Sequence, residues 1–403
     1  MSEQVSIVLV GIGGYGNTYV SALLGQSGEK SWRLAGVVDP LASKAPGFAA
    51  LQALDVPFYA TLDEFYAGNS ADLAVIASPI QYHCTQTCTA LRHGSNVLCE
   101  KPVSAVIQEV EQMIAARDHA ERFVGIGYQW SFHPVIQAFK ADVLAGLFGR
   151  PIRLRTMVLW PRNDKYYGRN NWAGALQSSR GDWILDSPVN NACAHYLHNM
   201  LYVIGPTVDR SAQPATVQAE LYRANPITNY DTAALRVMTT CGAEILFYTT
   251  HAVTRNRGPE FVYEFEKGTV TFNYKSKLLW ATFSDGSSKD YGCPDTQITT
   301  KLWDAIAACR GEKKIVCGLE AAMMHTLCVN GAQDSVPAVK DFPPSWVYKA
   351  GVPGNQFRVM PGLADLMPAA YDAGLLLSDY QAQPWSQLGR VVSLDNYHRF
   401  PSH

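Results

Sequence analysis

The chain has 403 residues, of which 47% are apolar and only 17% are charged, and its net charge is −2. This length predicts about two to three domains, and the apolar content is enough for more than one hydrophobic core. The nearly balanced charge, with no basic run, excludes proteins that track a phosphate backbone, so we expect no nucleic-acid partner.

The first predicted element is a strand over Val5 to Val10, and a helix is predicted over Asn17 to Leu24. Between them the chain reads Gly11-Ile12-Gly13-Gly14-Tyr15-Gly16. In this context the G-x-G-x-x-G spacing predicts a dinucleotide-binding turn. Gly11 permits a sharp reversal, Gly13 lets the main chain approach a pyrophosphate, and Gly16 lets the helix pack closely on the sheet.

The second predicted strand, Leu34 to Val38, ends in Asp39, about 20 residues beyond the glycine loop. A carboxylate at this place accepts hydrogen bonds from the adenosine ribose and repels a 2′-phosphate. No arginine follows Asp39, and Lys44 is the one nearby cation. We therefore expect NAD rather than NADP as the cofactor.

Strands and helices continue to alternate through the N-terminal third, which predicts an α/β fold with a Rossmann-type doubly wound parallel sheet. The further predicted elements of this part are the strands Leu73 to Ala77, Asn96 to Cys99 and Arg122 to Ile126, and the helices His83 to Leu91 and Val106 to Ala116.

After Tyr128 a helix is predicted over Pro134 to Leu147, followed by long strands with period-two alternation. The clearest hairpin is Glu260 to Tyr274, with a turn at Lys267-Gly268, one apolar face and one polar face. This pattern predicts an α+β domain with a large, mostly antiparallel open sheet that buries a face against helices or another subunit. We expect an NAD-binding domain over 1–127, a substrate-binding and oligomerisation domain over 128–340, and a C-terminal extension of unassigned role over 341–403.

The low charged fraction, against a typical value of about 25%, favours burial of surface between subunits, so we expect a homodimer or homotetramer formed through the open sheet. The chain lacks an apolar leader and any run of about 18 apolar residues, which predicts a cytoplasmic protein without a membrane partner. The nine cysteines are expected to be reduced. Cys84 and Cys88 lack two further ligands nearby, so we expect no metal.

These motifs resemble those of the Gfo/Idh/MocA family of oxidoreductases. Ala77-Ser78-Pro79 with His83, Glu100-Lys101-Pro102, Tyr166-Tyr167 with Trp172, and the helix from His195 to Gly205 are similar to four further segments of that family. The resemblance implies NAD-dependent oxidation of a sugar, a cyclitol or a glycoside. The residues expected to bind the cofactor are Gly11, Ile12, Gly13, Gly14, Tyr15, Gly16, Asp39, Ser78, Pro79, His83, Glu100, Lys101 and Gln129.

Oxidation of a secondary alcohol needs a hydride acceptor and a group that takes the hydroxyl proton. By resemblance we assign the proton to His195, whose ordinary pKa of about 6.5 suits a general base. Lys101 is expected to orient and polarise the hydroxyl, since burial beside a positive nicotinamide would lower its pKa from about 10.4.

The chain departs from the family pattern before His195. An alignment from the downstream helix puts Asn191 at the position of the family's aspartate, on the helical face of His195. An alignment from the upstream glycines puts Asp186 there instead. Because Pro188 suits a first helical turn capped by Asp186 or Ser187, we prefer the downstream alignment, which makes Asp186 mainly a cap and Asn191 the third catalytic candidate.

A polar and aromatic cluster, which includes Asn170, is expected to bind sugar hydroxyls, with Trp172 stacking on the ring; the cluster suits a structural loop about equally well. The expected substrate residues are Arg162, Tyr166, Tyr167, Arg169, Trp172, Asn191 and His195. Two other functions stay open: cleavage of a glycoside by transient oxidation without net NADH, and NAD binding without turnover in a regulatory protein.

Overall fold

A computed structural model describes residues 4–26 and 31–402. The expectation of no leader rests partly on Met1 to Glu3, which lie outside the described residues. The chain divides into two compact units. The first unit comprises Met1–Ser104, Gln108–His133 and Gln297–Met323, and the second comprises Ala105–Ile107, Pro134–Thr296 and Met324–His403. Residues 297–323 thus return to the first unit, whereas the predicted division at residues 127 and 340 placed them in the substrate-binding domain.

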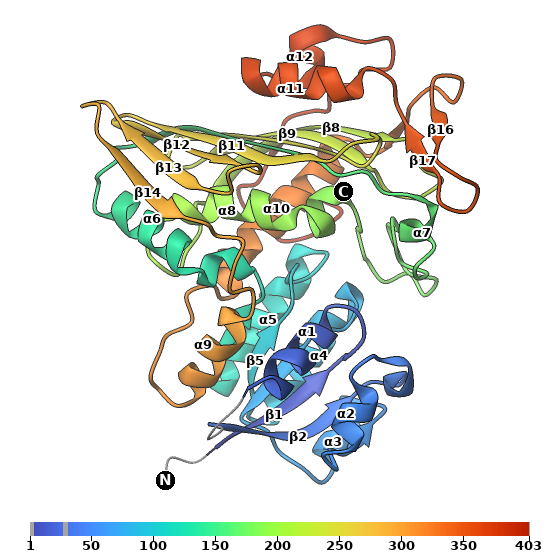
Figure 1. The fold of residues 1–403 in the computed structure, drawn as a ribbon, viewed down its shortest axis with the longest axis vertical. Helices are drawn as coiled ribbons and strands as arrows, with labels where there is room; N and C mark the ends of the chain where they lie inside the picture. The colour runs from blue at the N-terminus through green and yellow to red at the C-terminus, as the bar shows by residue number, and fades with distance from the viewer. Residues whose placement is uncertain (1–3, 27–30, 403) are drawn as a thin grey trace. The chain divides into compact units, whose positions relative to one another are not determined.

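The first unit is built on a six-stranded sheet in the order β3-β2-β1-β4-β5-β6 (Figure 1), and all of its pairings are parallel. This sheet confirms the predicted doubly wound fold. Its strands are β1 (Val5–Val10), β2 (Trp32–Val38), β3 (Phe58–Tyr59), β4 (Leu73–Ile76), β5 (Asn96–Cys99) and β6 (Val124–Ile126).

The helices of the first unit alternate with the strands, as expected for this fold. They are α1 (Gly16–Leu24), α2 (Phe48–Gln52), α3 (Leu62–Tyr66), α4 (His83–Arg92), α5 (Ile107–Ala120) and the returning α9 (Thr300–Cys309). Helix α9 packs on the same core as β1 and β5, because Leu302, Ala305 and Ile306 belong to one buried cluster with Leu9 and Leu98.

The second unit contains a ten-stranded sheet in the order β14-β13-β12-β11-β7-β10-β9-β8-β15, with β18 paired to β8. The β7–β10 and β8–β15 pairs are parallel and the others are antiparallel, so the predicted mostly antiparallel sheet is confirmed. The strands are β7 (Pro151–Leu159), β8 (Pro214–Arg223), β9 (Thr232–Thr239), β10 (Glu244–Thr250), β11 (Arg257–Phe265), β12 (Gly268–Asn273), β13 (Leu279–Phe283), β14 (Ser288–Gly292), β15 (Lys340–Asp341) and β18 (Val392–Ser393).

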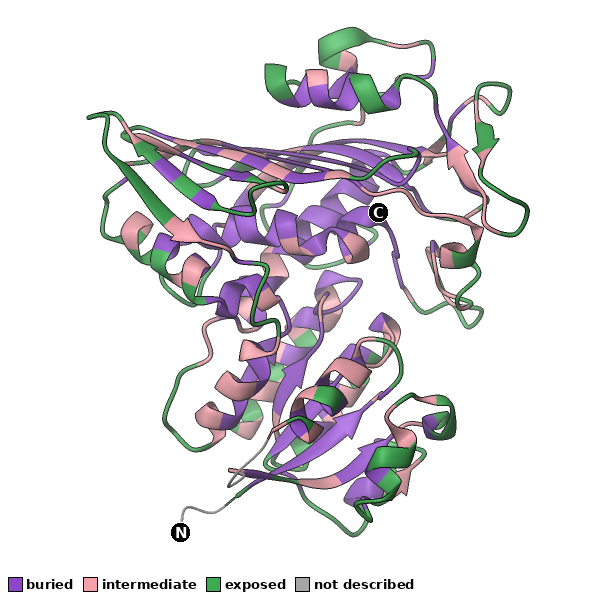
Figure 2. Ribbon diagram, viewed as in Figure 1, coloured by how far each residue is buried: buried purple, intermediate pink, exposed green. Residues whose placement is uncertain are grey.

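Helices cover both faces of this sheet (Figure 1). Helices α6 (Pro134–Leu144), α8 (Ala194–Val203) and α10 (Leu319–Ser335) lie on one face, and α11 (Leu363–Ala373) and α12 (Leu377–Gln381) lie on the other. Strands β8, β9 and β10 are accordingly buried along most of their length, whereas β12 and β13 alternate between buried and exposed residues (Figure 2). The hairpin from β11 to β12 therefore has the predicted alternation, with its turn at Glu266-Lys267 because Phe265 pairs with Gly268.

The C-terminal extension covers part of the sheet, whose apolar face we expected to be buried against helices or another subunit. Met367 and Tyr371 of α11 are buried in one cluster with Met157 and Tyr248 of the sheet. The same face also carries ion pairs, such as Arg155 with Glu264 at 2.7 Å, and Arg155 donates to the carbonyl of Tyr371 at 2.8 Å. Helices α11 and α12 of the extension thus bury part of this face within the chain itself.

Candidate active site

The glycine loop leaves its main chain open where a pyrophosphate would approach. Gly11 has a φ of +78°, which favours glycine. A Cβ on Gly13 would meet no heavy atom within 4 Å, whereas one on Gly16 would lie 2.0 Å from the carbonyl oxygen of Gly11. Gly16 is therefore needed for the contact between the start of α1 and the loop itself, more than for packing of the helix on the sheet. The open backbone at Gly13 and the N-terminus of α1 fit an anionic dinucleotide.

Asp39 follows β2 and is hydrogen-bonded to this loop. Its Oδ2 accepts from the backbone N–H of Ile12 at 2.9 Å, and its Oδ1 accepts from that of Leu41 at 2.8 Å. The carboxylate therefore lies beside the glycine loop, where the adenosine ribose is expected. Lys44 is exposed in the following turn, Ala42–Lys44.

Asp39→Ala is expected to weaken NADH binding about 10- to 100-fold, because hydrogen bonds to a charged group contribute about 1.5–3 kcal/mol each. Binding of NADPH should fall less or improve, since the charge that repels a 2′-phosphate is lost. Fluorescence titrations of both dinucleotides measure the ratio of the two dissociation constants. Asp63→Ala, an exposed carboxylate in the first turn of α3, is the control. An unchanged ratio would show that Asp39 does not select the cofactor.

Lys101 follows β5 next to a buried ion pair. The carboxylate of Glu100 accepts from Lys301 Nζ of α9 and, at 2.5 Å, from the hydroxyl of Tyr19. The side chains of Lys301 and Glu100 are 0% and 7% exposed. Lys301 also donates to the carbonyl of Gly127 at 3.0 Å, and the backbone N–H of Lys101 donates to Glu100 at 3.1 Å. The cluster fixes the backbone that presents Lys101 at the carboxyl edge of the sheet, where such folds bind ligands.

Lys301 is a site residue that the sequence analysis missed. A signal was present, because Lys301 lies on the buried face of α9 together with Leu302 and Ala305. A charged residue on an apolar helical face is rarely buried unless it is paired. The partner, Glu100, lies too far away in the sequence for this signal to identify it.

Tyr15 connects the glycine loop to the turn after β6. Its hydroxyl donates to Gln129 Oε1 at 3.1 Å, and its ring lies 4.4 Å from Lys301 Nζ. Burial raises the pKa of Tyr15, and the neighbouring Lys301 partly opposes the shift. Gln129 is half-buried, whereas Trp130 is buried in the core.

His83 lies between two of the expected cofactor segments. Its ring nitrogens are 2.8 Å from the carbonyl oxygen of Pro102 and 2.9 Å from that of Ser78. The ring is 1% exposed, and burial lowers its pKa. His83 therefore connects the loop containing Ser78 and Pro79 to the segment after Lys101.

In the second unit, Asn191 and His195 lie in two consecutive helical segments. Asn191 belongs to a π-helical turn, Pro188–Ala192, and His195 lies in the first turn of α8. Cys193, with φ −114° and ψ 12°, separates them. The prediction of one continuous helix through both residues is therefore wrong. The 3.6-residue spacing on which we placed both side chains on one face does not apply across a π-helical turn.

The predicted capping role of Asp186 is also wrong. The cap is Ser187, whose Oγ accepts from the backbone N–H of Asn190 at 3.1 Å. Asp186 is 2% exposed; its Oδ1 accepts from Asn191 Nδ2 at 2.8 Å and its Oδ2 from the backbone N–H of Gly174 at 2.6 Å. The residues that the two alignments propose for one position are thus in direct contact, and a carboxylate lies beside the amide of Asn191.

The expected substrate cluster surrounds the ring of Tyr166. The guanidinium carbons of Arg162 and Arg169 lie 4.8 Å and 3.7 Å from its centroid. Arg169 also lies 5.1 Å from the half-buried ring of Trp172. The ring of Tyr167 packs edge-on against Tyr166, with centroids 5.2 Å apart. The side-chain Oδ1 of Asn170 accepts a hydrogen bond from the backbone N–H of Trp172 at 3.1 Å, and this bond shapes the turn.

A hairpin of the C-terminal extension holds the start of this cluster. The hairpin is β16 (Tyr348–Ala350) with β17 (Phe357–Val359), and α7 (Asp164–Tyr167) begins beside it. The side chain of Asn163 caps α7 through the N–H of Tyr166 at 3.0 Å and donates from its Nδ2 to Asn355 Oδ1. The N–H of Asp164 also donates to the carbonyl of Gln356 at 2.9 Å. The extension therefore has a structural role at the candidate site.

Asn355→Ala is expected to raise the rate of tryptic cleavage at the exposed Lys165 and Arg169 several-fold, since loss of the bond to Asn163 makes local opening easier. Timed proteolysis followed by mass spectrometry measures this rate. Asn355→Asp keeps an acceptor for Asn163 and should cleave at the original rate. Equal cleavage of all three proteins would show that the hairpin does not hold the loop.

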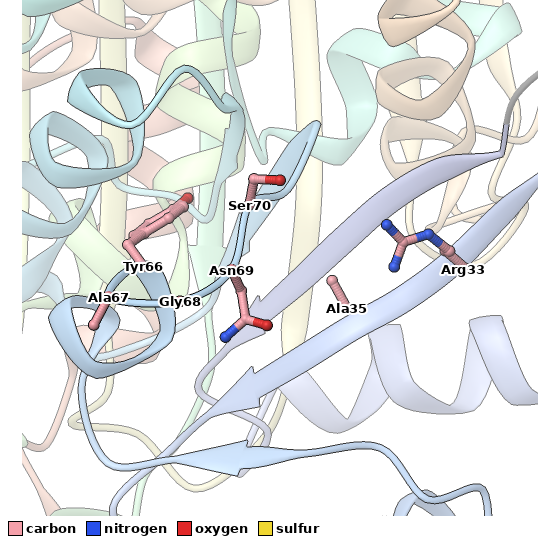
Figure 3. A pocket seen from close by; sticks show the side chains of 7 residues that line it. All are labelled: Arg33, Ala35, Tyr66, Ala67, Gly68, Asn69 and Ser70. Carbon is pink, nitrogen blue, oxygen red and sulfur yellow. The ribbon is translucent and has the colours of Figure 1, made fainter.

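A polar recess in the first unit lies apart from these residues. It is lined by Arg33 and Ala35 of β2 and by residues 66–70 (Figure 3). These residues lie toward the amino ends of β2 and β4, whereas the glycine loop and Asp39 follow the carboxyl ends of β1 and β2. The recess therefore does not belong to the candidate cofactor site.

Over residues 4–26 and 31–402, no helix is long and apolar enough to cross a membrane. Within the same ranges, no three His, Cys, Asp or Glu side chains form a group that could hold a metal ion.

Residues 5–128 match the family described as "Oxidoreductase family, NAD-binding Rossmann fold", GFO_IDH_MocA. The rhizopine catabolism protein MocA of Rhizobium meliloti is 30% identical over 54% of this chain and 63% of its own length. Inositol 2-dehydrogenase 1 of Saccharopolyspora erythraea is 23% identical over 75% of this chain and 90% of its own length. The chain thus matches less than two thirds of the length of MocA, and 38% of that of 2,7-anhydro-N-acetylneuraminate hydratase of Mediterraneibacter gnavus, which is 26% identical over 37% of this chain.

Solved structures share the fold at lower identity. The WlbA dehydrogenase from Bordetella pertussis, in complex with NADH and UDP-GlcNAcA, has a TM-score of 0.67 at 20% identity and covers 83% of this chain and 97% of its own. Levoglucosan dehydrogenase in complex with NADH has a TM-score of 0.67 at 16% identity, with the same coverage. At these identities the likeness concerns the fold alone.

Proposed function

Because the chain belongs to the Gfo/Idh/MocA family of oxidoreductases, we propose that it oxidises a secondary hydroxyl of a sugar, a cyclitol or a glycoside with NAD. The single observation that carries this proposal is the position of Lys101 at the carboxyl end of β5, on a backbone held by the buried pair of Glu100 and Lys301. The activities of the named relatives support the substrate class.

The residues of the first unit fit NAD. The open backbone at Gly13 would receive the pyrophosphate, and Asp39 would accept from the ribose diol. Gln129 would hold the carboxamide, since its Oε1 is already oriented by Tyr15. When bound, NAD supplies a nicotinamide that accepts a hydride.

Two side chains are proposed to act on the substrate hydroxyl. The Nζ of Lys101 orients it by a hydrogen bond and stabilises negative charge as it develops on the oxygen. The imidazole of His195 takes the hydroxyl proton as general base. The amide of Asn191, fixed by Asp186, binds a neighbouring hydroxyl. The loop around Tyr166 and Trp172 holds the rest of the substrate.

The test uses purified protein with NAD and a panel of inositols, free sugars and aryl glycosides. NADH absorbance and product mass are read from the same samples. The proposal predicts stoichiometric NADH and a product that has lost two hydrogens. A panel that is turned over without either change would contradict it.

A second candidate is cleavage of a glycoside through transient oxidation. The contact between Asp186 and Asn191 favours it, because this carboxylate could serve as a further acid or base. Glycoside cleavage of this kind would release the aglycone without accumulation of NADH.

We also propose that the protein acts in the cytoplasm as a homo-oligomer; light scattering after size exclusion would test the assembly.

A further inference from the structure

The substrate loop holds two guanidinium groups, those of Arg162 and Arg169, that form no ion pair with a carboxylate in the described part of the chain. Arg162 donates to the carbonyl of Pro161 at 3.2 Å, and Arg169 donates to that of Tyr166 at 2.6 Å. Within the described residues, neither arginine has a carboxylate within 4.0 Å. On the sheet of the same unit, by contrast, Arg153 and Arg155 reach glutamates at 2.6 Å and 2.7 Å.

Two buried acids of this unit, Asp186 and Asp231, do not pair with these arginines. Both oxygens of Asp186 accept from Gly174 and Asn191. Asp231 is 0% exposed, and its Oδ2 accepts from the backbone and side chain of Asn225 at 2.8 Å. Neither acid forms an ion pair with Arg162 or Arg169 in the described residues.

Two polar atoms of the loop also lack partners among the described residues. The Nε of Arg162 and the hydroxyl of Tyr167 are buried without a hydrogen bond. A buried donor without an acceptor costs about 1–3 kcal/mol. A bound ligand that offers oxygen acceptors would remove this cost.

The two arginines also affect the neighbouring side chain of His251. His251, at the end of β10, lies with its ring 5.9 Å from that of Tyr166. Burial first, and then the charges of Arg162 and Arg169, lower the pKa of His251 to about 3. The imidazole of His251 is therefore neutral near pH 7, and it adds no positive charge to that of the two guanidinium groups.

We propose that the substrate carries an acidic group, a carboxylate or a phosphate, which binds to Arg162 and Arg169. The planar guanidinium matches both anions through two parallel hydrogen bonds. Both guanidinium groups already stack on the ring of Tyr166, so they lose little side-chain entropy when an anion binds. This inference rests on the proposed function, because it takes the loop around Tyr166 as the substrate loop.

The test is calorimetric titration of the NAD-loaded protein with D-glucuronate, D-glucose 6-phosphate and D-glucose at equal ionic strength. At least one acidic sugar should bind about 10-fold or more tightly than glucose, since charge-assisted hydrogen bonds are roughly twice as strong as neutral ones. The acid that binds more tightly identifies the group as carboxylate or phosphate.

Arg162→Gln and Arg169→Gln should each reduce the preference for the acid over glucose, while NADH binding and the unfolding temperature stay unchanged. Arg162→Lys, which keeps the charge but loses the planar pair of donors, should retain part of the preference. Arg150→Gln, at an exposed arginine paired with Glu266, is the control.

The inference is overturned if both acids bind no more tightly than glucose, absence of binding included, or if both glutamine variants keep the full preference. Binding is measured without turnover, so the two proposals fail separately. Selective binding of an acid in a protein that reduces no NAD would contradict the proposed function and leave the acidic site in place.

Discussion

Lys101→Ala is expected to lower kcat about 10²- to 10⁴-fold, the range that a positioned acid–base group contributes. The fold should be retained, because the backbone N–H of Lys101 and the side chain of Glu100, whose bonds help to hold this segment, are unchanged in the variant. NADH affinity should change little. Steady-state kinetics with the substrate from the panel, together with a fluorescence titration of NADH, measure both effects.

Two further variants make this result specific. Lys101→Met keeps the length of the side chain without its charge and should be as inactive as alanine. Lys44→Ala, at an exposed lysine beyond Asp39, should keep its full kcat. A kcat of Lys101→Ala within about 10-fold of the unmodified protein would remove Lys101 from the chemistry.

Lys301→Met is expected to give the largest loss of stability, about 3–5 kcal/mol in the free energy of unfolding, because it leaves the Glu100 carboxylate buried and unpaired. NADH binding should also weaken, since Lys301 contacts the ring of Tyr15 in the glycine loop. Urea unfolding measures the first effect and a fluorescence titration the second.

Double variants separate the charge from the packing. Glu100→Gln combined with Lys301→Met removes both charges and should recover part of the stability lost in the single variant. Lys313→Met is the matched control, because Lys313 is 55% exposed in its pair with Asp304 and such surface pairs contribute at most about 1 kcal/mol. Equal losses in Lys301→Met and Lys313→Met would show that the buried pair does not hold the segment.

Features that depend on neighbouring residues could be predicted from the sequence. The glycine loop and Asp39 lie within one strand, turn, helix and strand, and their spacing alone predicts a dinucleotide site. The hairpin of β11 and β12 could be predicted equally well, because alternating apolar residues flank a short turn. These expectations rest on short-range patterns that tertiary contacts did not override.

Features that depend on distant partners could not be predicted. Lys301 is 201 residues from Glu100, and Asn355 is 192 residues from Asn163. No pattern in either segment identifies its partner. The apolar run of the extension predicted burial, but only the structure shows that Met367 and Tyr371 pack on the sheet.

The segment before His195 illustrates a different limit. Two alignments competed there, and each assumed regular geometry. The chain instead forms a π-helical turn that brings Asn191 against Asp186. Both residues therefore belong to the candidate site, and spacing rules that assume an ordinary helix could not show this.

Transfer of a hydride from a substrate carbon to NAD can be followed by isotope labelling. The protein is incubated with NAD and a polyol or sugar deuterated at every carbon, and the dinucleotide is then analysed by mass spectrometry. If the chain oxidises its substrate in this way, reduced dinucleotide that has gained one deuterium from carbon accumulates. Turnover of the labelled substrate with no deuterium in the dinucleotide would contradict hydride transfer to NAD.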